Sequence, residues 1–296
     1  MSVDWLTPLT LPAPVLSLLP QANGGLWAGG MGGVAACEND QWTAHIAGLP
    51  ISGVAALAAA GKWLFAGGGE GIARSADGGL TWQPGVIHGV SASISAIAVS
   101  PDFDRDSSVL AATLAGGVLR SEDAGQSWTA ANFGLSDTEI TALLWPQTDL
   151  VLAAAAHGIY RSPNGGRAWR QTAGTEGQAV AALARLRDGR FLAAVEGGAL
   201  LVSQDGADWA ALPNDLPAGI EPAALCVLPD GSLLLGALDA GIFRSDDDGT
   251  GWTQVHAEGV FSLAESAGRV YAGTGTDLLA SDDGGWHFAA QPRPPL

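Results

Sequence analysis

Five polar side chains occupy equivalent points of a repeating sequence pattern and are the residues best placed to do chemistry. They are Glu70, His157, Glu196, Asp239 and Asp277. Two carboxylates that face each other could act as acid and base on a glycosidic bond, and the same ring of groups could bind a cationic or sugar ligand. Turns favour polar residues in any protein, so a solvated rim without a ligand is the alternative interpretation.

Three alternating aspartates form a weaker candidate, for a metal site. Asp102, Asp104 and Asp106 lie in the segment SPDFDRDSSV (100–109) and could present oxygens to calcium, but the glycine and distal glutamate of an EF-hand loop are missing, so a simple turn is the favoured alternative. The five histidines show no paired metal-ligand spacing. The glycine-rich run GGGEG (67–71) lacks the helix that a phosphate cradle needs. We therefore expect no bound metal and no cofactor.

These residues belong to a repeat that is built around one short box. The stretch RSADGGLTW (74–82) recurs as RSEDAGQSW, RSPNGGRAW, VSQDGADW, RSDDDGTGW and ASDDGGWHF. A degenerate copy, ENDQW, ends at Trp42. The closing aromatics at 42, 82, 128, 169, 209, 252 and 288 are about 40 residues apart, which is the period of one propeller blade. The box residues are Ser75, Asp77, Gly79, Trp82, Ser121, Asp123, Gly125, Trp128, Ser162, Asn164, Gly166, Trp169, Ser203, Asp205, Trp209, Ser245, Asp247, Gly249, Trp252, Ser281, Asp283, Gly285 and Phe288.

The predicted role of the box is to form a turn rather than to do chemistry. Its Ser and Asp side chains can accept hydrogen bonds from nearby backbone amides, and its Gly tolerates a positive φ. The Trp then buries a large ring between blades. Four arginines recur immediately before the box serine, and we expect them to pair with structural partners on one face. They are Arg74, Arg120, Arg161 and Arg244.

Short strands precede every box. Each unit opens with a run of small apolar residues such as VAALA (54–58), continues with a strand ending in Ala or Gly such as LFAGG, and reaches the box through a third strand such as GIARS. The sequence therefore predicts an all-β chain, 1–296, that forms a single seven-bladed β-propeller of four-stranded antiparallel blades. The predicted repeat units are 13–50, 51–92, 93–138, 139–178, 179–217, 218–258 and 259–296.

Residues 3–12 add one candidate outer strand without inner strands of its own. Their sequence WLTPLTLP (5–12) is similar to the outer-strand passage WTAHIAGLP (42–50). We expect this segment to complete the last blade and close the ring, so that the tail after Phe288 is surplus or lies beside it.

The box pattern resembles the Asp-box, or BNR, repeat of sialidases, xyloglucanases, sortilin-type receptors and Hcf136-type photosystem II assembly factors. The resemblance implies the propeller fold, but the same box occurs in hydrolases, receptors and assembly factors. It also implies that ligands bind on the face formed by the turns between second and third strands and by the connections between blades. The sialidase Arg-Ile-Pro motif is missing, and both tyrosines, Tyr160 and Tyr271, lie in predicted strands, so a sialidase is rejected.

The net charge of the chain restricts the classes of partner that it can bind. With 30 acidic and 13 basic residues the formal net charge is -17, which repels phosphate backbones and anionic lipids, so we expect neither nucleic-acid binding nor membrane insertion. The amino terminus lacks the basic segment and unbroken apolar run of a secretion signal, so a cytoplasmic location is expected. Cys37 and Cys226 form no CxxC pair and are expected to be buried thiols.

The sequence thus favours a non-enzymatic interaction or assembly platform whose partner is another protein with a basic surface. The alternative is a glycoside hydrolase or lyase, or a carbohydrate-binding propeller, that takes a glycan at the carboxylates of the channel mouth.

Overall fold

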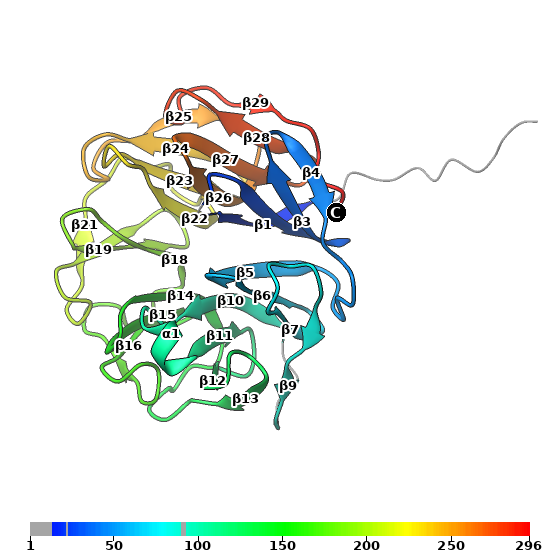
Figure 1. Ribbon diagram of the computed structural model, residues 1–296. Coiled ribbons are helices and arrows are strands. Elements are labelled where there is room, and N and C mark those ends of the chain that lie inside the picture. The colour runs from blue at the N-terminus through cyan, green and yellow to red at the C-terminus, as the bar shows by residue number, and fades with distance from the viewer. Residues whose placement is uncertain (1–13, 22, 90–92) are drawn as a thin grey trace, which may run out of the picture.

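Seven sheets surround a central axis in the computed structural model, which describes residues 14–21, 23–89 and 93–296 (Figure 1). The predicted seven-bladed propeller is confirmed. The strands of the first three blades are β1 (Val15–Pro20), β2 (Leu26–Gly30), β3 (Gly33–Glu38) and β4 (Gln41–Ala44); β5 (Val54–Ala60), β6 (Trp63–Gly68), β7 (Gly71–Ser75) and β8 (Gln83–Pro84); and β10 (Ile94–Val99), β11 (Val109–Thr113), β12 (Val118–Ser121) and β13 (Ser127–Ala130).

The remaining four blades repeat the same order from the axis outward. Their strands are β14 (Ile140–Gln147), β15 (Leu150–Ala155), β16 (Gly158–Ser162) and β17 (Arg170–Gln171); β18 (Val180–Arg185), β19 (Phe191–Val195), β20 (Leu200–Ser203) and β21 (Ala210–Leu212); β22 (Pro222–Val227), β23 (Leu233–Ala237), β24 (Gly241–Ser245) and β25 (Thr253–His256); and β26 (Val260–Ser266), β27 (Arg269–Thr274), β28 (Leu278–Ser281) and β29 (Ala289–Ala290).

Small residues allow neighbouring blades to approach each other closely. The second strand of a blade is packed against the first strand of the next, and a Cβ added at Gly67 of β6 would lie 2.4 Å from Cγ2 of Ile94. A Cβ at Gly236 of β23 would lie 2.6 Å from a methyl group of Val260. Both distances are too short for real atoms, which explains the Ala- and Gly-rich second strands seen in the sequence.

The boxes form the predicted turns. The hydroxyl of Ser75 accepts from the amide of Gly79 (2.8 Å) and donates to Asp77 (2.8 Å). Asp77 in turn accepts from the amide (2.9 Å) and the hydroxyl (2.6 Å) of Thr81. The serine-to-glycine bond recurs at Ser121, Ser162, Ser245 and Ser281. The box aromatic Trp128 is completely buried between blades, as expected for a ring that joins two sheets.

The last blade corrects one expectation about ring closure. Its outer strand β29 consists of Ala289 and Ala290, which pair with Leu279 and Ala280 of β28. The tail after Phe288 is therefore not surplus, because it supplies the fourth strand. The segment 3–12, expected to take this place, lies outside the described residues.

The first and last blades meet directly. The hydroxyl of Ser262 donates to the carbonyl of Val15 (3.4 Å), and that of Ser266 donates to the carbonyl of Gly25 (3.0 Å). On the periphery Arg269 forms an ion pair with Asp40 (2.9 Å). In Figure 1, β1 and β26 lie next to each other beside the axis, so packing between complete blades closes the described ring.

One blade carries a fifth strand that the sequence did not predict. β9 (Val86–Ile87) lies in the connection from the second blade to the third and runs parallel to β13. The amide of Val86 donates to the carbonyl of Gln126 (2.9 Å), and that of His88 donates to the carbonyl of Trp128 (3.0 Å). This strand covers the outer edge of the third blade.

Candidate binding face

One face of the ring is formed by the turns between second and third strands, which we call the rim. These turns are 31–32, 69–70, 114–117, 156–157, 196–199, 238–240 and 275–277. Backbone bonds join several of them to the connection that enters the same blade, for example from Leu114 to Ser93 (3.1 Å), Glu196 to Ala179 (2.9 Å) and Leu238 to Glu221 (2.8 Å). These hydrogen bonds therefore hold the rim turns, and the side chains that they carry, in fixed positions.

Two of the predicted carboxylates are part of this support. Oε2 of Glu70 accepts from the amide and the hydroxyl of Ser52, both at 3.3 Å. Oδ1 of Asp239 accepts from the amide of Glu221 (2.9 Å). In each case the acidic side chain fastens its turn to the connection entering the blade while remaining exposed to solvent.

His157 is held in a related way by a residue that the sequence analysis did not single out. Both its amide (2.9 Å) and its ring Nδ1 (3.0 Å) contact Oδ2 of Asp137. Burial raises the pKa of Asp137, but hydrogen bonds from the amide of Glu139 and from His157 outweigh this effect, so its pKa is lowered. The imidazole itself is 75% exposed and points to solvent from this anchored position.

The last two candidates differ from each other. Asp277 accepts from the hydroxyl of Thr276 (2.9 Å) and forms an ion pair with Arg293 (2.8 Å), and these contacts hold its pKa below the usual value against the opposing effect of burial. Glu196 is exposed, and no hydrogen bond or ion pair of its side chain occurs among the described residues. The five candidates lie on five different blades, and no hydrogen bond or ion pair joins any two of them.

Apolar side chains lie between these polar groups, although none of them was predicted as a candidate from the sequence. Met31, Leu114 and Leu238 occupy the rim turns of the first, third and sixth blades and are 55%, 47% and 42% exposed. Phe261, near the start of β26, is 39% exposed. The exposure of these side chains could have been predicted from the sequence, because a large apolar residue in a glycine-rich turn at the surface cannot pack into the core.

Two of the alternating aspartates of the third blade, Asp104 and Asp106, lie in a short helix, α1 (Phe103–Asp106), and Asp102 immediately precedes it. Phe103 of this helix packs on Phe65 with ring centres 5.8 Å apart. Asp106 accepts from the hydroxyl of Ser100 (2.7 Å). Asp102 accepts from the hydroxyl of Thr148 (2.8 Å). Among the residues that the structure describes, no group of three or more ligand side chains could hold a metal ion, and no helix is long and apolar enough to cross a membrane.

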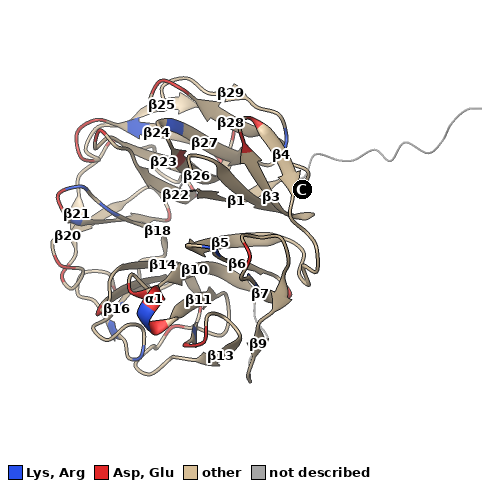
Figure 2. Cartoon of the chain, viewed as in Figure 1, with Lys and Arg blue, Asp and Glu red and all other residues tan. Residues whose placement is uncertain are grey.

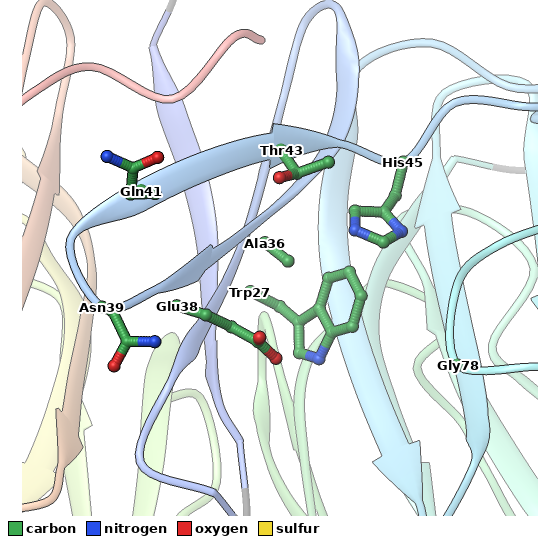
Figure 3. Close-up of a pocket in the computed structure, with 8 residues that line it drawn as sticks. All are labelled: Trp27, Ala36, Glu38, Asn39, Gln41, Thr43, His45 and Gly78. Carbon is green, nitrogen blue, oxygen red and sulfur yellow. The ribbon is translucent and has the colours of Figure 1, made fainter.

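A groove on the periphery, between the first two blades, is a second concave surface (Figure 3). Its cavity of about 440 Å³ is lined by Trp27, Ala36, Glu38, Asn39, Gln41, Thr43, His45 and Gly78. The ring of His45 lies edge-on to Trp27, with centres 4.8 Å apart, and its Nδ1 contacts the carbonyl of Gly79 (3.0 Å). Glu38 accepts from the side chain of Asn23 (2.9 Å). His45 therefore joins the first two blades, whereas the contact of Glu38 lies within the first blade.

Charge is distributed around the whole ring. Figure 2 shows acidic residues on loops of every part of the molecule rather than in one cluster. Two of the four arginines before the boxes form ion pairs: Arg120 with Glu122, and Arg244 with Asp246 (2.7 Å). Arg74 instead donates to Gln83 (3.3 Å). The expected structural partner is therefore an acid of the box for two of the four arginines.

Comparisons with known proteins identify the fold but no sequence family. No family model matches the chain, and no curated protein sequence matches it. The GH74 xyloglucanase of Xanthomonas campestris superimposes with a TM-score of 0.77 at 18% identity, over 95% of this chain and 55% of that enzyme. YCF48 bound to a D1 peptide superimposes with a TM-score of 0.71 at 19% identity, over 94% of this chain and 98% of that one. YCF48 from Cyanidioschyzon merolae gives 0.70 at 15% identity, over 92% and 96%.

The chain has the propeller fold of these proteins. It spans 55% of the xyloglucanase and nearly all of the YCF48 chains. At such low identities the likeness establishes the fold alone, because unrelated functions share this architecture. The fold that the xyloglucanase and assembly-factor resemblance implied is confirmed, while membership of the Asp-box repeat family stays a prediction.

Proposed function

We propose that this chain is a non-enzymatic propeller that binds another protein through its rim. The observation that carries the proposal is the mixture on one hydrogen-bonded face of exposed apolar side chains, such as Met31, Leu114 and Leu238, with solvated acids. Protein interfaces combine apolar contacts with a polar surround in this way. The YCF48 neighbour bound to a D1 peptide supports the proposal, since a propeller of similar length takes a peptide.

The partner is proposed to present Lys or Arg together with apolar side chains. Glu70, Glu196 and Asp239 project from the rim of a chain whose formal net charge is -17. A negative field accelerates encounter with a cationic surface and repels anionic ones, which argues against nucleic acid and anionic membranes as partners.

The alternative, a carbohydrate-active propeller, is favoured by the GH74 neighbours. Two of the carboxylates it would need, Glu70 and Asp239, accept hydrogen bonds that fasten turns. A panel of polysaccharides and aryl glycosides separates the two functions. Turnover that disappears in Glu196→Ala or Asp239→Ala would replace the binding proposal with the enzymatic one.

Affinity capture from native extract tests the binding proposal directly. The rim variant Glu70→Gln, Glu196→Gln, Asp239→Asn should lose the captured protein. A matched variant of three exposed acids on the opposite face, Asp104→Asn, Asp149→Asn, Asp208→Asn, carries the same change in charge and should retain it. Loss of the partner from both variants would show that only net charge matters, and the rim would not be the site.

A further inference from the structure

Arg161 of β16 lacks the hydrogen bonds that its counterparts in other blades make. Arg74, Arg120 and Arg244 stand at the same position, and each donates to a backbone carbonyl in the box turn of the next blade. The acceptors are Ala124 (3.3 Å), Gly165 (3.1 Å) and Gly284. Among the described residues the side chain of Arg161 has no hydrogen bond or ion pair, and its Nε is buried without a partner. Arg244 also leaves its Nε unpaired, but its terminal nitrogens are bonded.

A one-residue deletion in the facing box explains this difference. In the three accepting turns the carbonyl belongs to the third residue after the box serine, where φ is 55°, 67° and 74°. The box of the fifth blade (203–209) is one residue shorter, and the amide that bonds the hydroxyl of Ser203 is that of Gly206, three residues on rather than four. The residue whose carbonyl would accept from Arg161 is therefore missing.

A second arginine lies directly opposite the first. Arg161 of β16 is the cross-strand partner of Arg170 of β17. The equivalent arginines of the other blades face Gln83, Thr129 and Thr253. Like charges placed opposite each other destabilise a strand pair. No ion pair joins either arginine to a carboxylate within the described ranges, including the exposed Asp208 at the neighbouring box.

A cavity of about 290 Å³ opens at this pair. It is lined by Arg161, Pro163, Arg170, Gln171, Thr172 and Ala207. The adjoining box aromatic is affected as well. The indole Nε1 of Trp82 and of Trp169 each donates at 2.8 Å to a carbonyl of the preceding blade, whereas that of Trp209 is buried without a partner. The seam between the fourth and fifth blades thus leaves two buried donors unpaired, and the side chain that carries one of them, Arg161, lines the cavity.

We propose that this cavity binds a carboxylate group through the guanidinium groups of Arg161 and Arg170. A guanidinium presents parallel N–H donors that match the two oxygens of a carboxylate, and an anion between the arginines removes their repulsion. A singly charged carboxylate is favoured over a doubly charged phosphate because the whole chain has a formal net charge of -17. The site lies among box turns, away from the rim, and does not depend on the proposed function.

Titration of the intact protein with sodium acetate at constant ionic strength tests the site. The Nε–H signal of Arg161 in an NMR spectrum is the readout, with inorganic phosphate and a terminally blocked Ala-Glu-Ala peptide as parallel probes. Acetate should give a saturable shift, and Arg170→Gln should weaken its binding at least about tenfold. Tighter binding of the peptide would assign the carboxylate to an acidic side chain of a partner, and equal binding would assign it to a small acid.

Two variants make the test specific. Inserting one glycine between Asp205 and Gly206 restores the usual box length and should abolish the acetate response, because the new carbonyl accepts from Arg161. Arg74→Gln, at the equivalent position of the second blade, should leave the response unchanged. No saturable shift, a response that survives the insertion, or stronger binding of phosphate than of acetate would overturn the proposal.

Discussion

At the scale of single residues, the box serine hydroxyl is a buried junction between two hydrogen bonds. In the third blade the hydroxyl of Ser121 accepts from the amide of Gly125 (2.9 Å) and donates to Asp123 (2.8 Å), and the serine is 1% exposed. Ser121→Ala leaves a buried amide without a partner, so the free energy of unfolding should fall by about 1–3 kcal/mol. Chemical denaturation measures the change, and a loss below about 0.5 kcal/mol would match an ordinary surface substitution instead.

A second prediction at this scale contrasts two arginines at the same box position. Arg120 is 8% exposed and donates to Gly165, Ser108 and Glu122, so Arg120→Met should cost about 1.5–3 kcal/mol. Arg161→Met removes a charge that has no described partner and that faces Arg170, so its melting temperature should be unchanged or higher. Equal losses in the two variants, measured by calorimetry, would show that Arg161 is paired in solution.

At the scale of the element, the box turn predicts how stability depends on pH. The hydroxyl and amide of Thr81 lower the pKa of Asp77 from 3.8 to about 2, and the amide of Gly251 and neighbouring groups lower that of Asp247 to about 2. A carboxyl whose folded pKa lies below its unfolded value stabilises the fold above the unfolded pKa. This contribution is lost as the pH falls from about 4 to about 2.

Asp77→Asn tests this linkage. In the fourth blade Asn164 already accepts from the box serine hydroxyl and from the amide of Ala168, both at 2.9 Å, so an asparagine fits the turn. The melting temperature of Asp77→Asn should therefore fall less steeply than that of the wild type as the pH decreases from 4 to 2. Parallel curves of melting temperature against pH for the two proteins would show that the ionised carboxylate of Asp77 does not stabilise the fold.

The elements that the sequence predicted well are those with a strong local signal. Strand runs and boxes could be read from it because small apolar stretches and the Ser–Asp–Gly spacing each specify local geometry. β9 and β29 were not predicted, and each contains only two residues. The formation of so short a strand depends on which sheet edge lies next to it in the fold rather than on its own sequence. α1 was read as a turn region, because its four residues are fixed by Phe103 packing on a residue 38 positions earlier, Phe65.

At the scale of the whole molecule, close packing between the first and last blades predicts that the ring is sensitive to added volume at their seam. A Cβ at Gly273 would lie 2.3 Å from the carbonyl oxygen of Val15 and 2.5 Å from the hydroxyl of Ser262. Gly273→Ala should therefore separate the two blades and cost about 1–3 kcal/mol. Gly275→Ala is the control, because its Cβ would meet only Phe261 at an ordinary 3.8 Å. Similar unfolding curves for both variants would contradict closure by direct packing.

The position of the candidate site could be predicted from the repeat, but its composition could not. The five polar residues lie in equivalent rim turns because every blade repeats the same strand order, and their role as a site stays a prediction. The pairing of Asp277 with Arg293 and the anchoring of His157 by Asp137 depend on contacts between segments that are separated along the chain. No local pattern in a single sequence specifies such contacts.

The association kinetics of the captured partner test the central claim most directly. The rate should be measured over a range of salt concentrations for the wild type, the rim variant and the matched variant of the opposite face. Binding through the rim predicts that changing Glu70, Glu196 and Asp239 lowers the association rate and flattens its salt dependence, while changing Asp104, Asp149 and Asp208 does neither. Equal effects from the two variants would contradict binding through the rim.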